Sequence, residues 1–395
     1  MPKQNLRNPM FHQNLKILKS KLPFMEPRKI SVFIPVYRES PLLEPLLTRL
    51  LNDPYKNREI FVIVDEPTER SIETSRRFSD NVYFIFNRRR MGKAHVLNEI
   101  TKQADGDIYL FLDSDTLIDG DGESFLEVIA KEMEDVDIIE VKKEVIRDTF
   151  LAKITSYDYL SFNLTSWLFS KKIGKCLGVN GAAFAIRKET FNSLGGFRKV
   201  ICEDLDLATR SFIGGARFKF IDEVAAYTKV PPSLREWFNQ RKRWGIGSAL
   251  WFKEYFNLLK RVLREHPEVV MPSLLSIFPA LPLFLANLLI PDDLFIKMIY
   301  ISLILLSTRT SLFLPPTALT STTISTLRNL LIMIGSLAAY SAIFSLIARM
   351  FQLSFNPLDF IIYYFTLAPL WFFIIVTSLI KVYVKRKNIE VDWKV

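Results

Sequence analysis

The chain has 395 residues, carries a formal net charge of +10 and is 49% hydrophobic, so its length allows a sizeable core or two domains. The charge suits an anionic membrane surface or phosphate-bearing substrates, and no zinc-finger, RRM or basic-zipper pattern supports a nucleic-acid partner. The two cysteines, Cys176 and Cys202, belong to no CxxC pair or histidine cluster, which excludes a disulfide framework and favours a reducing, cytosolic setting.

Composition shifts along the chain and indicates where its parts begin and end. Residues 1–29 are basic, interrupted by prolines and free of a signal-peptide cleavage pattern, so we expect an interfacial or loosely held arm. Residues 30–231 predict a sheet domain, and residues 232–268 predict amphipathic interface helices. A transmembrane region of about four helices is expected over 269–382, followed by a basic cytoplasmic tail over 383–395.

The first half of the chain alternates short apolar runs with helical patterns. The runs predict strands, and the stretches between them predict helices, the first of which begins near Ser40. Such alternation indicates an α/β fold with a mostly parallel sheet. The predicted strands are residues 30–36, 59–64, 82–86, 107–112 and 138–145, and the later predicted helices are residues 68–78, 93–103 and 149–170.

Two acidic residues directly follow predicted strands. Asp65 comes one residue after the run 59–64, and Asp113 comes one residue after the run 107–112. Ligands of open α/β sheets bind outside the carboxyl ends of the strands. We therefore expect both carboxylates at one edge of the sheet.

Asp113-Ser114-Asp115 is a DxD motif that closes a predicted strand. Carboxylates at i and i+2 suit a hard divalent cation that bridges a diphosphate, and such a cation would neutralise charge on a departing nucleotide. A lone DxD is more often a solvated acidic loop. Its position after a strand, with Asp65 expected at the same edge, favours the metal site.

Gly92-Lys93 is the nearest approach to a phosphate-binding loop. The sequence has no GxxxxGK[ST] pattern, and Ala94 stands where a metal-binding hydroxyl would be needed, so an NTPase is rejected. Lys93, close to the basic run 88–90, remains a candidate contact for donor phosphates. The alternative is ordinary surface charge.

Glu203-Asp204 is an adjacent acidic pair in a segment that opens with Gly195-Gly196. One carboxylate of such a pair serves as a general base if it faces a cavity. Taken alone, the pair is more often the N-terminus of a helix, where acidic side chains favour the helix dipole.

Residues 232–265 interleave aromatic residues with Arg and Lys, a pattern typical of a helix in the lipid headgroup layer or of one packed on a soluble domain. Within it, Gln240, Arg243 and Trp244 occupy i, i+3 and i+4 and so share one helix face. A guanidinium beside an indole suits a pyrophosphate next to a stacked sugar. An interfacial anchor is the rival interpretation.

Uncharged stretches near the C-terminus are long enough to cross about 30 Å of hydrocarbon at about 1.5 Å per residue. Residues 294–314 are a weaker candidate, since Lys297 and Arg309 flank a short apolar centre, and a re-entrant or interfacial segment is the alternative. The three clear stretches are residues 271–290, 329–348 and 360–380.

Charge asymmetry favours four spans over three. With four, Arg309, Arg328 and the basic residues from Lys381 onward lie on the side of the sheet domain, whereas Asp292 and Asp293 lie opposite. The chain is therefore expected to be a multi-pass protein of the cell membrane with a cytoplasmic catalytic domain.

Together, these motifs over about residues 30–250 resemble glycosyltransferase family 2, in its membrane-integrated branch of cellulose, chitin and hyaluronan synthases and ceramide glucosyltransferase. Residues 88–98 resemble the R-x-x-G-K-x-x-x-L-N signature, and Gln240 to Trp244 resemble the QxxRW motif. The resemblance implies a GT-A-like fold and an inverting single displacement.

The resemblance also implies roles for individual residues. Asp204 would be the general base and Glu203, Asn180 and Gly181 would lie on the acceptor side. Residues implied to bind a UDP-sugar are Asp65, Lys93, Asp113, Gln240, Arg243 and Trp244, and those implied to hold Mg²⁺ or Mn²⁺ are Asp113 and Asp115.

The sequence departs from the family pattern in three ways: Glu66-Pro67 replaces the usual Asp and Gly, Cys202 replaces a common Thr, and no FxVTxK gating segment is present. We expect a metal-dependent hexosyltransferase that extends a polysaccharide or oligosaccharide through β-linkages at the membrane. Transfer of one sugar to a lipid acceptor, such as a polyprenyl phosphate or a ceramide-like alcohol, is the first alternative. An inactive sugar-nucleotide-binding scaffold is the second.

Overall fold

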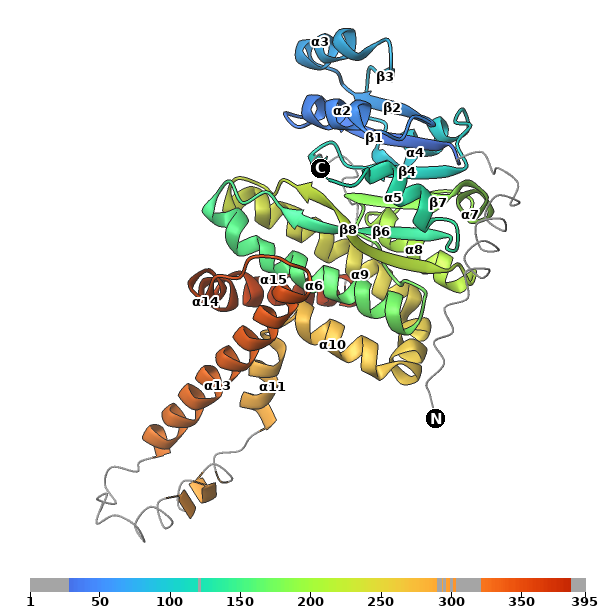
Figure 1. The fold of residues 1–395 in the computed structure, drawn as a ribbon. Coiled ribbons are helices and arrows are strands. Elements are labelled where there is room, and N and C mark those ends of the chain that lie inside the picture. Colours follow the sequence, from blue (N-terminus) through green and yellow to red (C-terminus); the bar gives the residue numbers. More distant parts are fainter. Residues whose placement is uncertain are drawn as a thin grey trace, which may run out of the picture.

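The computed structural model describes residues 28–119, 122–289, 293, 296–298, 301–302 and 321–384. Figure 1 shows a layered α/β domain from which two C-terminal helices extend. The expected α/β fold class is confirmed. The strands are β1 (Ile30–Tyr37), β2 (Arg58–Asp65), β3 (Tyr83–Asn87), β4 (Ile108–Leu112), β5 (Thr116–Ile118), β6 (Ile138–Val145), β7 (Ala183–Arg187) and β8 (Phe218–Thr228).

The helices agree closely with the periodic stretches of the sequence, and side-chain caps explain several of their starts. Thr68, Ser124 and Thr149 each accept a backbone N–H bond at a helix N-terminus. The helices are α2 (Leu43–Asn52), α3 (Glu69–Phe78), α4 (Lys93–Thr101), α5 (Phe125–Glu132), α6 (Phe150–Lys172), α7 (Lys188–Ser193), α8 (Glu203–Ile213), α9 (Leu234–Glu265), α10 (Pro267–Ile277), α11 (Leu281–Leu289), α13 (Ser321–Met350), α14 (Pro357–Phe365) and α15 (Leu367–Val384).

The strands form one sheet of eight, in the order β3-β2-β1-β4-β7-β6-β8-β5. Strands β1 to β4 are parallel to one another, whereas β7 runs antiparallel to both of its neighbours, β4 and β6. The strand order reverses between β1 and β4, so the carboxyl ends of these two strands flank a switch point where α/β sheets bind ligands. Asp65 closes β2 and Asp113 follows β4, which brings both carboxylates to one edge as expected.

The core has two layers, one on each side of the sheet. Along β1, Val32 and Ile34 face α2 and α5, whereas Phe33 faces the other side, as the two-residue repeat of a strand requires. The layer around Phe33 continues without a break through α6 and α9 into the C-terminal helices, where Tyr363 and Trp371 belong to the same cluster. The sheet domain and the described C-terminal helices therefore share one core.

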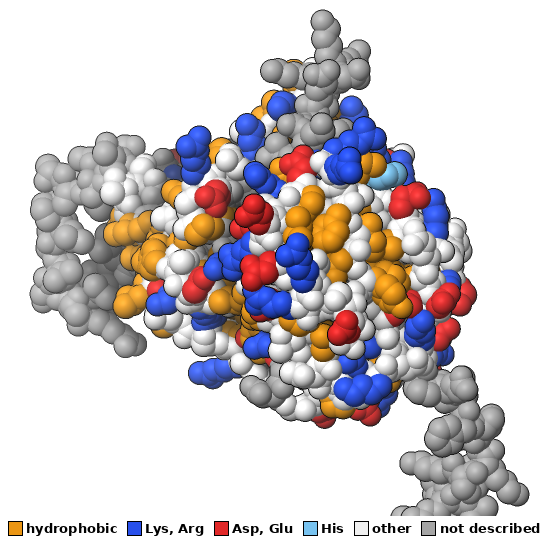
Figure 2. Space-filling model, turned by 90° about the horizontal axis from the view of Figure 1, so that it is seen from above, with side chains coloured by type: hydrophobic (Ala, Val, Ile, Leu, Met, Phe, Trp, Pro, Cys, Tyr) orange, Lys and Arg blue, Asp and Glu red, His pale blue; other side chains and the backbone are white. Residues whose placement is uncertain are grey.

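Within the described residues, two helical segments are long and apolar enough to cross a membrane: Ser325–Met350 and Pro357–Val384, with mean hydropathies of 2.2 and 2.0. They contain the predicted spans 329–348 and 360–380. Figure 2 shows hydrophobic side chains gathered at the left, whereas charged and hydrophobic side chains are interspersed over the rest of this face. The candidate 294–314 lies almost wholly outside the described residues.

The predicted span 271–290 is divided in the structure. Helix α10 ends at Ile277, Phe278 has non-helical dihedrals, and α11 begins at Leu281. Pro279 explains the break, because a residue that precedes proline is disfavoured in the helical region. The expectation of one continuous helix here is wrong, although the stretch is as apolar as predicted.

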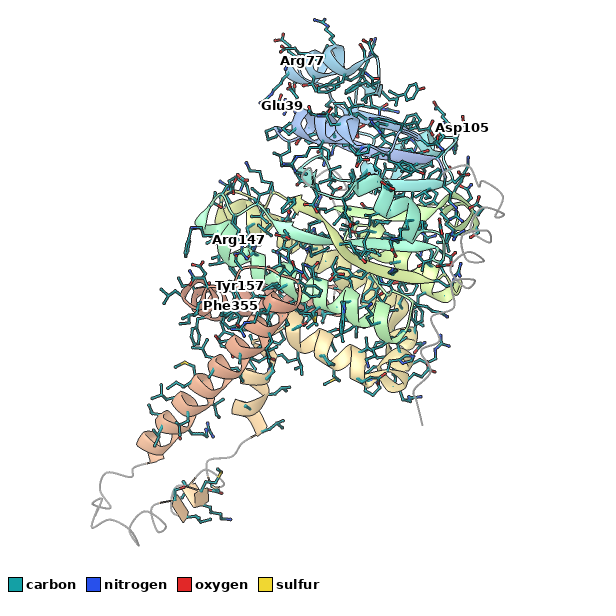
Figure 3. All side chains as sticks on the ribbon, in the orientation of Figure 1. Glu39, Arg77, Asp105, Arg147, Tyr157 and Phe355 are labelled. Atoms are coloured by element: carbon teal, nitrogen blue, oxygen red, sulfur yellow. The ribbon has the colours of Figure 1, made fainter. Side chains whose placement is uncertain are left out.

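The loop between α13 and α14 holds the C-terminal helices on α6. The hydroxyl of Tyr157 on α6 donates to the carbonyl of Asn356 over 2.7 Å, and Arg147 Nη2 donates to the carbonyl of Ser354 over 3.0 Å. Figure 3 labels Arg147, Tyr157 and Phe355 at this junction. The two aromatic rings meet edge to face at 5.8 Å between centroids.

Candidate active site

A cavity of about 1750 Å³ opens at the sheet edge where β1, β2 and β4 end, and it is bordered by α4, α8 and α9. Every site residue selected from the sequence lines it, although those residues are spread over 180 positions of the chain. They are Asp65, Lys93, Asp113, Asp115, Asn180, Gly181, Glu203, Asp204, Gln240, Arg243 and Trp244.

Asp65 holds the loop that joins β3 to α4. Its Oδ2 accepts the backbone N–H groups of Met91 (2.9 Å) and Gly92 (3.1 Å), and its Oδ1 accepts the amide of Asn87 over 2.9 Å. Gly92 has φ +91°, a conformation that glycine adopts at least cost. The buried carboxylate thus fixes the position of Lys93, the next residue.

Lys93 begins α4 and joins the two acidic regions of the cavity. Its Nζ lies 2.6 Å from Asp113 Oδ1 and 3.5 Å from Glu203 Oε1. Burial lowers the pKa of the ammonium, but Asp113, Glu203 and Asp204 together raise that pKa well above its ordinary value. Lys93 therefore carries a permanent positive charge between the DxD motif and the acidic pair.

The DxD motif lies between β4 and β5. The backbone N–H of Asp113 donates to the carbonyl of Ala182 over 3.1 Å, which ties the motif to the loop before β7. Asp115 is exposed and lines the cavity. No cluster of three His, Cys, Asp or Glu side chains suited to a metal occurs in the part of the chain that the structure describes.

The donor set of the DxD motif fits Mg²⁺ or Mn²⁺ that is completed by a substrate. Mg²⁺ is commonly held by one or two carboxylates together with substrate phosphates, rather than by a full protein cage. Asp113 and Asp115 supply two carboxylates on a cavity wall, and Asp113 Oδ1 is the oxygen that accepts from Lys93. Oxygen ligands are also those that Mn²⁺ accepts.

Asp204 lies in the first turn of α8, so the acidic pair begins a helix. Both of its residues also line the cavity. Its Oδ2 accepts the backbone N–H of Gly181 over 2.8 Å, and its Oδ1 accepts the N–H of Leu205 over 2.8 Å. Two backbone N–H groups thus fix the orientation of this carboxylate at the N-terminus of α8.

Glu203 lies beside Asp204, with 14% of its side chain exposed. Burial raises the pKa of this carboxyl to about 6, while Lys93 lowers it and Asp204 raises it. Glu203 therefore keeps its proton to a higher pH than an ordinary glutamic acid does.

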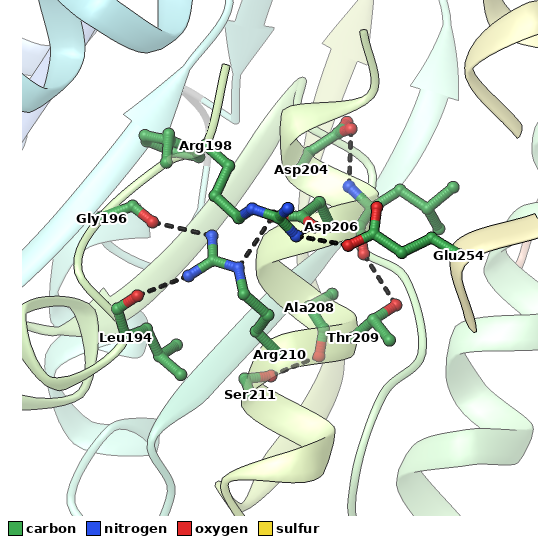
Figure 4. A network of polar contacts seen from close by, with 12 residues as sticks. Leu194, Gly196, Arg198, Asp204, Asp206, Ala208, Thr209, Arg210, Ser211 and Glu254 are labelled. Atoms are coloured by element: carbon green, nitrogen blue, oxygen red, sulfur yellow. Dashed lines mark hydrogen bonds and ion pairs between the residues drawn. The ribbon is translucent and has the colours of Figure 1, made fainter. Parts of the chain in front are cut away.

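Two arginines fix α8 against the rest of the domain (Figure 4). Arg210 donates to Asp206 Oδ2 over 2.8 Å and to the carbonyls of Leu194 and Gly196. Arg198 pairs with Asp206 Oδ1 at 3.0 Å and with Glu254 on α9 at 2.8 Å. Helix α8, which carries Asp204, is thus bonded to α9 and to the preceding loop that contains Gly195 and Gly196.

Arg241, inside the QxxRW segment, was not selected from the sequence. It is fully buried, its Nη2 donates to Asp158 Oδ2 over 2.7 Å, and Tyr363 donates to Asp158 Oδ1 over 2.9 Å. Its guanidinium lies 4.5 Å from the ring centroid of Trp244, within cation–π range. In the sequence, the one sign of this environment is that Arg241 lies between Trp237 and Trp244 at helical spacing.

One side of the cavity is lined by aliphatic and aromatic residues of α9, α10, α11 and α15. We call this side the apolar limb. It continues from Trp244 toward the C-terminal helices and borders the divided segment at α10 and α11. Its residues are Phe256, Leu259, Leu263, Leu274, Ile277, Leu281, Phe372, Ile375 and Leu379.

Comparison with known proteins identifies the family. Residues 27–247 match the model of glycosyltransferase-like family 2, which covers the sheet domain and the first part of α9. The chain belongs to glycosyltransferase-like family 2. All site residues lie inside the matched region, so the membership expected from the motifs is confirmed.

Curated relatives within this family are similar over part of their length. Poly-β-1,6-N-acetyl-D-glucosamine synthase of Staphylococcus aureus is 25% identical over 236 residues, which cover 58% of this chain and 57% of the relative. The probable glycosyltransferase YdaM of Bacillus subtilis is 27% identical over 267 residues, covering 64% and 61%. The family 2 chain thus matches about three fifths of the length of these proteins.

The chain is also similar to solved structures at low identity. A mannosyltransferase of Pyrobaculum calidifontis in complex with GDP-Man and Mn²⁺ has a TM-score of 0.49 and 19% identity, covering 83% of this chain and 94% of that protein. Residues 1–349 of Staphylococcus aureus TarS in complex with UDP-GlcNAc give a TM-score of 0.42 and 15% identity, covering 67% and 83%.

Proposed function

We propose that this family 2 protein is a membrane-bound, inverting hexosyltransferase that moves a sugar from a UDP-sugar to a growing oligosaccharide or polysaccharide in β-linkage. The observation that carries the proposal is the convergence of Asp113, Asp204 and Arg243 on one cavity. Donor-binding and proton-accepting groups border the same space, as a transfer in a single displacement requires.

On the donor side, Asp65, Lys93 and Asp113 are the proposed contacts of the nucleotide. Asp113 and Asp115 are the residues that would hold Mg²⁺ or Mn²⁺, which supplies positive charge next to the diphosphate when bound. Lys93 is already charged at this position. Its ammonium and the guanidinium of Arg243 stabilise the negative charge that UDP acquires as it leaves.

On the acceptor side, Asp204 removes the proton from the attacking hydroxyl. The hydroxyl oxygen then forms a bond to the anomeric carbon while the bond from that carbon to the UDP oxygen breaks, so the configuration inverts and UDP departs with the electron pair. Asn180, Gly181 and Glu203 border the acceptor. Gln240 and Trp244 border the sugar, with the indole as a stacking surface.

The membrane assignment is supported by the two apolar helical segments and by their shared core with the sheet domain. The chain has 52 Lys and Arg residues against 42 Asp and Glu residues, and some of the basic ones lie in the segment from Lys381 onward. Under the positive-inside tendency these residues favour a multi-pass arrangement with a cytoplasmic catalytic domain.

The acceptor class follows from two separate observations. Similarity to a poly-β-1,6-N-acetyl-D-glucosamine synthase supports a glycan acceptor. The apolar limb favours a second candidate, the transfer of one sugar to a lipid acceptor, because an aliphatic wall recognises a hydrocarbon chain better than a hydroxylated sugar.

The test uses the detergent-solubilised protein with radiolabelled UDP-glucose, UDP-N-acetylglucosamine or GDP-mannose, native lipids and Mg²⁺ or Mn²⁺. Products are resolved by size and by organic extraction. A metal-dependent ladder from one UDP-sugar supports glycan extension, and a single lipid-extractable product supports the second candidate. Hydrolysis of donors at the background rate, with no transfer, contradicts both and favours the inactive scaffold.

A further inference from the structure

A buried ion pair borders the cavity, where Glu140 belongs to the lining, and neither of its residues belongs to the set of motifs. Glu140 on β6 is 2% exposed and Lys143 is 1% exposed. Lys143 Nζ lies 2.7 Å from Glu140 Oε1 and also donates to the carbonyl of Val141 over 3.1 Å. Burying two charges costs several kcal/mol that their attraction only partly offsets. Such a pair is weak evidence for stability and calls for another explanation.

Irregular pairing of β6 brings the two side chains together. Residues three apart on a regular strand face opposite sides of a sheet. The register of β6 on β8 shifts between Val141 and Lys142, and such irregularities redirect side chains. The side chain of Asn163 on α6 then bonds both the N–H and the carbonyl of Lys143, which fixes this arrangement.

Glu140 connects the pair to the loop on the acceptor side. Its Oε1 accepts the backbone N–H of Asn180 over 3.2 Å, and its Oε2 accepts the hydroxyl of Ser166 over 2.8 Å. The next N–H along the loop, that of Gly181, is the one that Asp204 Oδ2 accepts. Two consecutive N–H groups of one loop are therefore held by two different carboxylates.

The same loop also reaches the donor side. The carbonyl of Ala182 accepts the N–H of Asp113, and the N–H of Ala182 donates to the side chain of Asn180. Three consecutive residues thus bond to Glu140, Asp204 and Asp113 in turn. A displacement at Glu140 would be transmitted to both carboxylates that the proposed reaction uses.

We propose that the Glu140–Lys143 pair is a positioning device that sets the loop at residues 180–182 and, through it, the carboxylate of Asp204. The proposal rests on the proposed function, in which Asp204 is the base. Lys143 pairs with Glu140 Oε1, and the same oxygen accepts the Asn180 N–H, so the pair holds this loop residue by a charge-assisted bond. Glu140 and Lys143 are proposed as positioning residues, because they act on Asp204 through the loop at residues 180–182.

The test compares Glu140→Gln, Lys143→Met and the double variant. Each single change leaves one buried charge unpaired, so we expect transfer kcat to fall at least about tenfold while the Kd for UDP changes less than about twofold. The double variant is neutral, and its Gln amide can accept from Asn180 and donate to Ser166. We expect its kcat to exceed that of either single variant, a coupling that simple loss of packing does not give.

Glu59→Gln is the matched control. Glu59 pairs with Lys29 at 2.7 Å, accepts the hydroxyl of Ser31, and holds the backbone N–H groups of Asp105 and Gly106. These partners are of the same kinds as those of Glu140, but they lie at the opposite ends of the strands from the cavity. We expect kcat of Glu59→Gln to remain within about twofold of the unchanged protein.

Amide hydrogen exchange of the full-length protein in detergent separates this proposal from the function on which it rests. Faster exchange at residues 180 and 181 in both single variants, with recovery in the double variant, supports the device even if no donor is turned over. Absence of transfer by the unchanged protein counts only against the proposed function. If a single variant fails to fold, Ser166→Ala replaces it, with an expected twofold to fivefold loss of kcat. Unchanged exchange and unchanged kcat in folded variants overturn the proposal.

Discussion

Gly181 lies against the carboxylate of Asp204. Its N–H donates to Asp204 Oδ2 over 2.8 Å, and a Cβ added at Gly181 would lie 2.8 Å from that oxygen and 3.3 Å from Lys93 Nζ. The glycine is required by this close approach, because its φ is not in the left-handed region. Any side chain here would compete for space with the proposed base.

Gly181→Ala is therefore expected to lower kcat by at least about tenfold, because the added methyl displaces the Asp204 carboxylate by a fraction of an ångström. Thermal unfolding should change little by comparison. The control is Gly335→Ala on α13, where an added Cβ meets nothing within 4 Å. Equal kcat values for both variants would contradict the positioning of Asp204 by this contact.

Asp204→Asn tests the base itself. An amide oxygen still accepts one N–H from the loop or the helix, so the fold should persist, but the group can no longer take a proton. We expect kcat to fall by about 10²-fold to 10⁴-fold with the Kd for UDP nearly unchanged. Asp222→Asn, at an exposed position of β8, is the control. Full transfer activity in folded Asp204→Asn would show that another group is the base.

Much of this arrangement could be predicted from local sequence. The alternation of apolar runs placed Asp65 and Asp113 at strand ends, and the carboxyl ends of neighbouring parallel strands must meet. Helical spacing likewise placed Gln240 and Trp244 on one face. These predictions succeeded because each depended on the period of a single strand or helix.

Contacts between distant segments could not be predicted in this way. Arg241 reads as one more basic residue of an amphipathic helix, yet Asp158 and Tyr363, from segments far away in the chain, bury it. Glu140 and Lys143 form a pair only because β6 pairs irregularly with β8. The break at Phe278 is different, because Pro279 is visible in the sequence. The length of the uncharged stretch nevertheless favoured the expectation of one continuous helix.

The buried Arg241–Asp158 pair gives a prediction about stability. Asp158→Asn leaves the Arg241 guanidinium buried without its counter-charge, so we expect the free energy of unfolding to fall by about 3–5 kcal/mol. Tyr363→Phe removes one hydrogen bond to Asp158 and should cost about 1–3 kcal/mol. Thermal and chemical unfolding in detergent measure both.

The control for this pair is Glu254→Gln. Glu254 and Arg198 are 46% and 45% exposed in their side chains, and an exposed pair contributes about 1 kcal/mol or less. A loss in Asp158→Asn no larger than that in Glu254→Gln would mean that the Arg241 charge is compensated in some other way.

Metal dependence is tested by chelation. If Asp113 and Asp115 hold a divalent cation together with the diphosphate, EDTA should abolish transfer and added Mg²⁺ or Mn²⁺ should restore it. Asp115→Asn should raise the metal concentration needed for half-maximal rate by at least about tenfold. Full activity in EDTA, with no change in Asp115→Asn, would leave Lys93 and Arg243 as the groups that neutralise the diphosphate.

Glu203 predicts a pH dependence of stability with a definite sign. Its pKa in the folded protein is about 6, against an ordinary value of 4.5, so the folded state binds the proton more tightly than the unfolded state does. Ionisation between about pH 4.5 and pH 6 therefore lowers the free energy of unfolding, by about 2 kcal/mol when complete. Glu203→Gln has no carboxyl to ionise.

The stability of Glu203→Gln relative to the unchanged protein should consequently rise as pH increases through this window. Unfolding curves of both proteins at pH 4.5 and pH 7, in one detergent and one buffer series, measure the change. A relative stability that stays constant would mean that Lys93 compensates the Glu203 charge fully, and one that falls would mean that Lys93 stabilises the ionised form. A rise would support Glu203 as a carboxyl group whose pKa burial raises, next to Asp204, the proposed base.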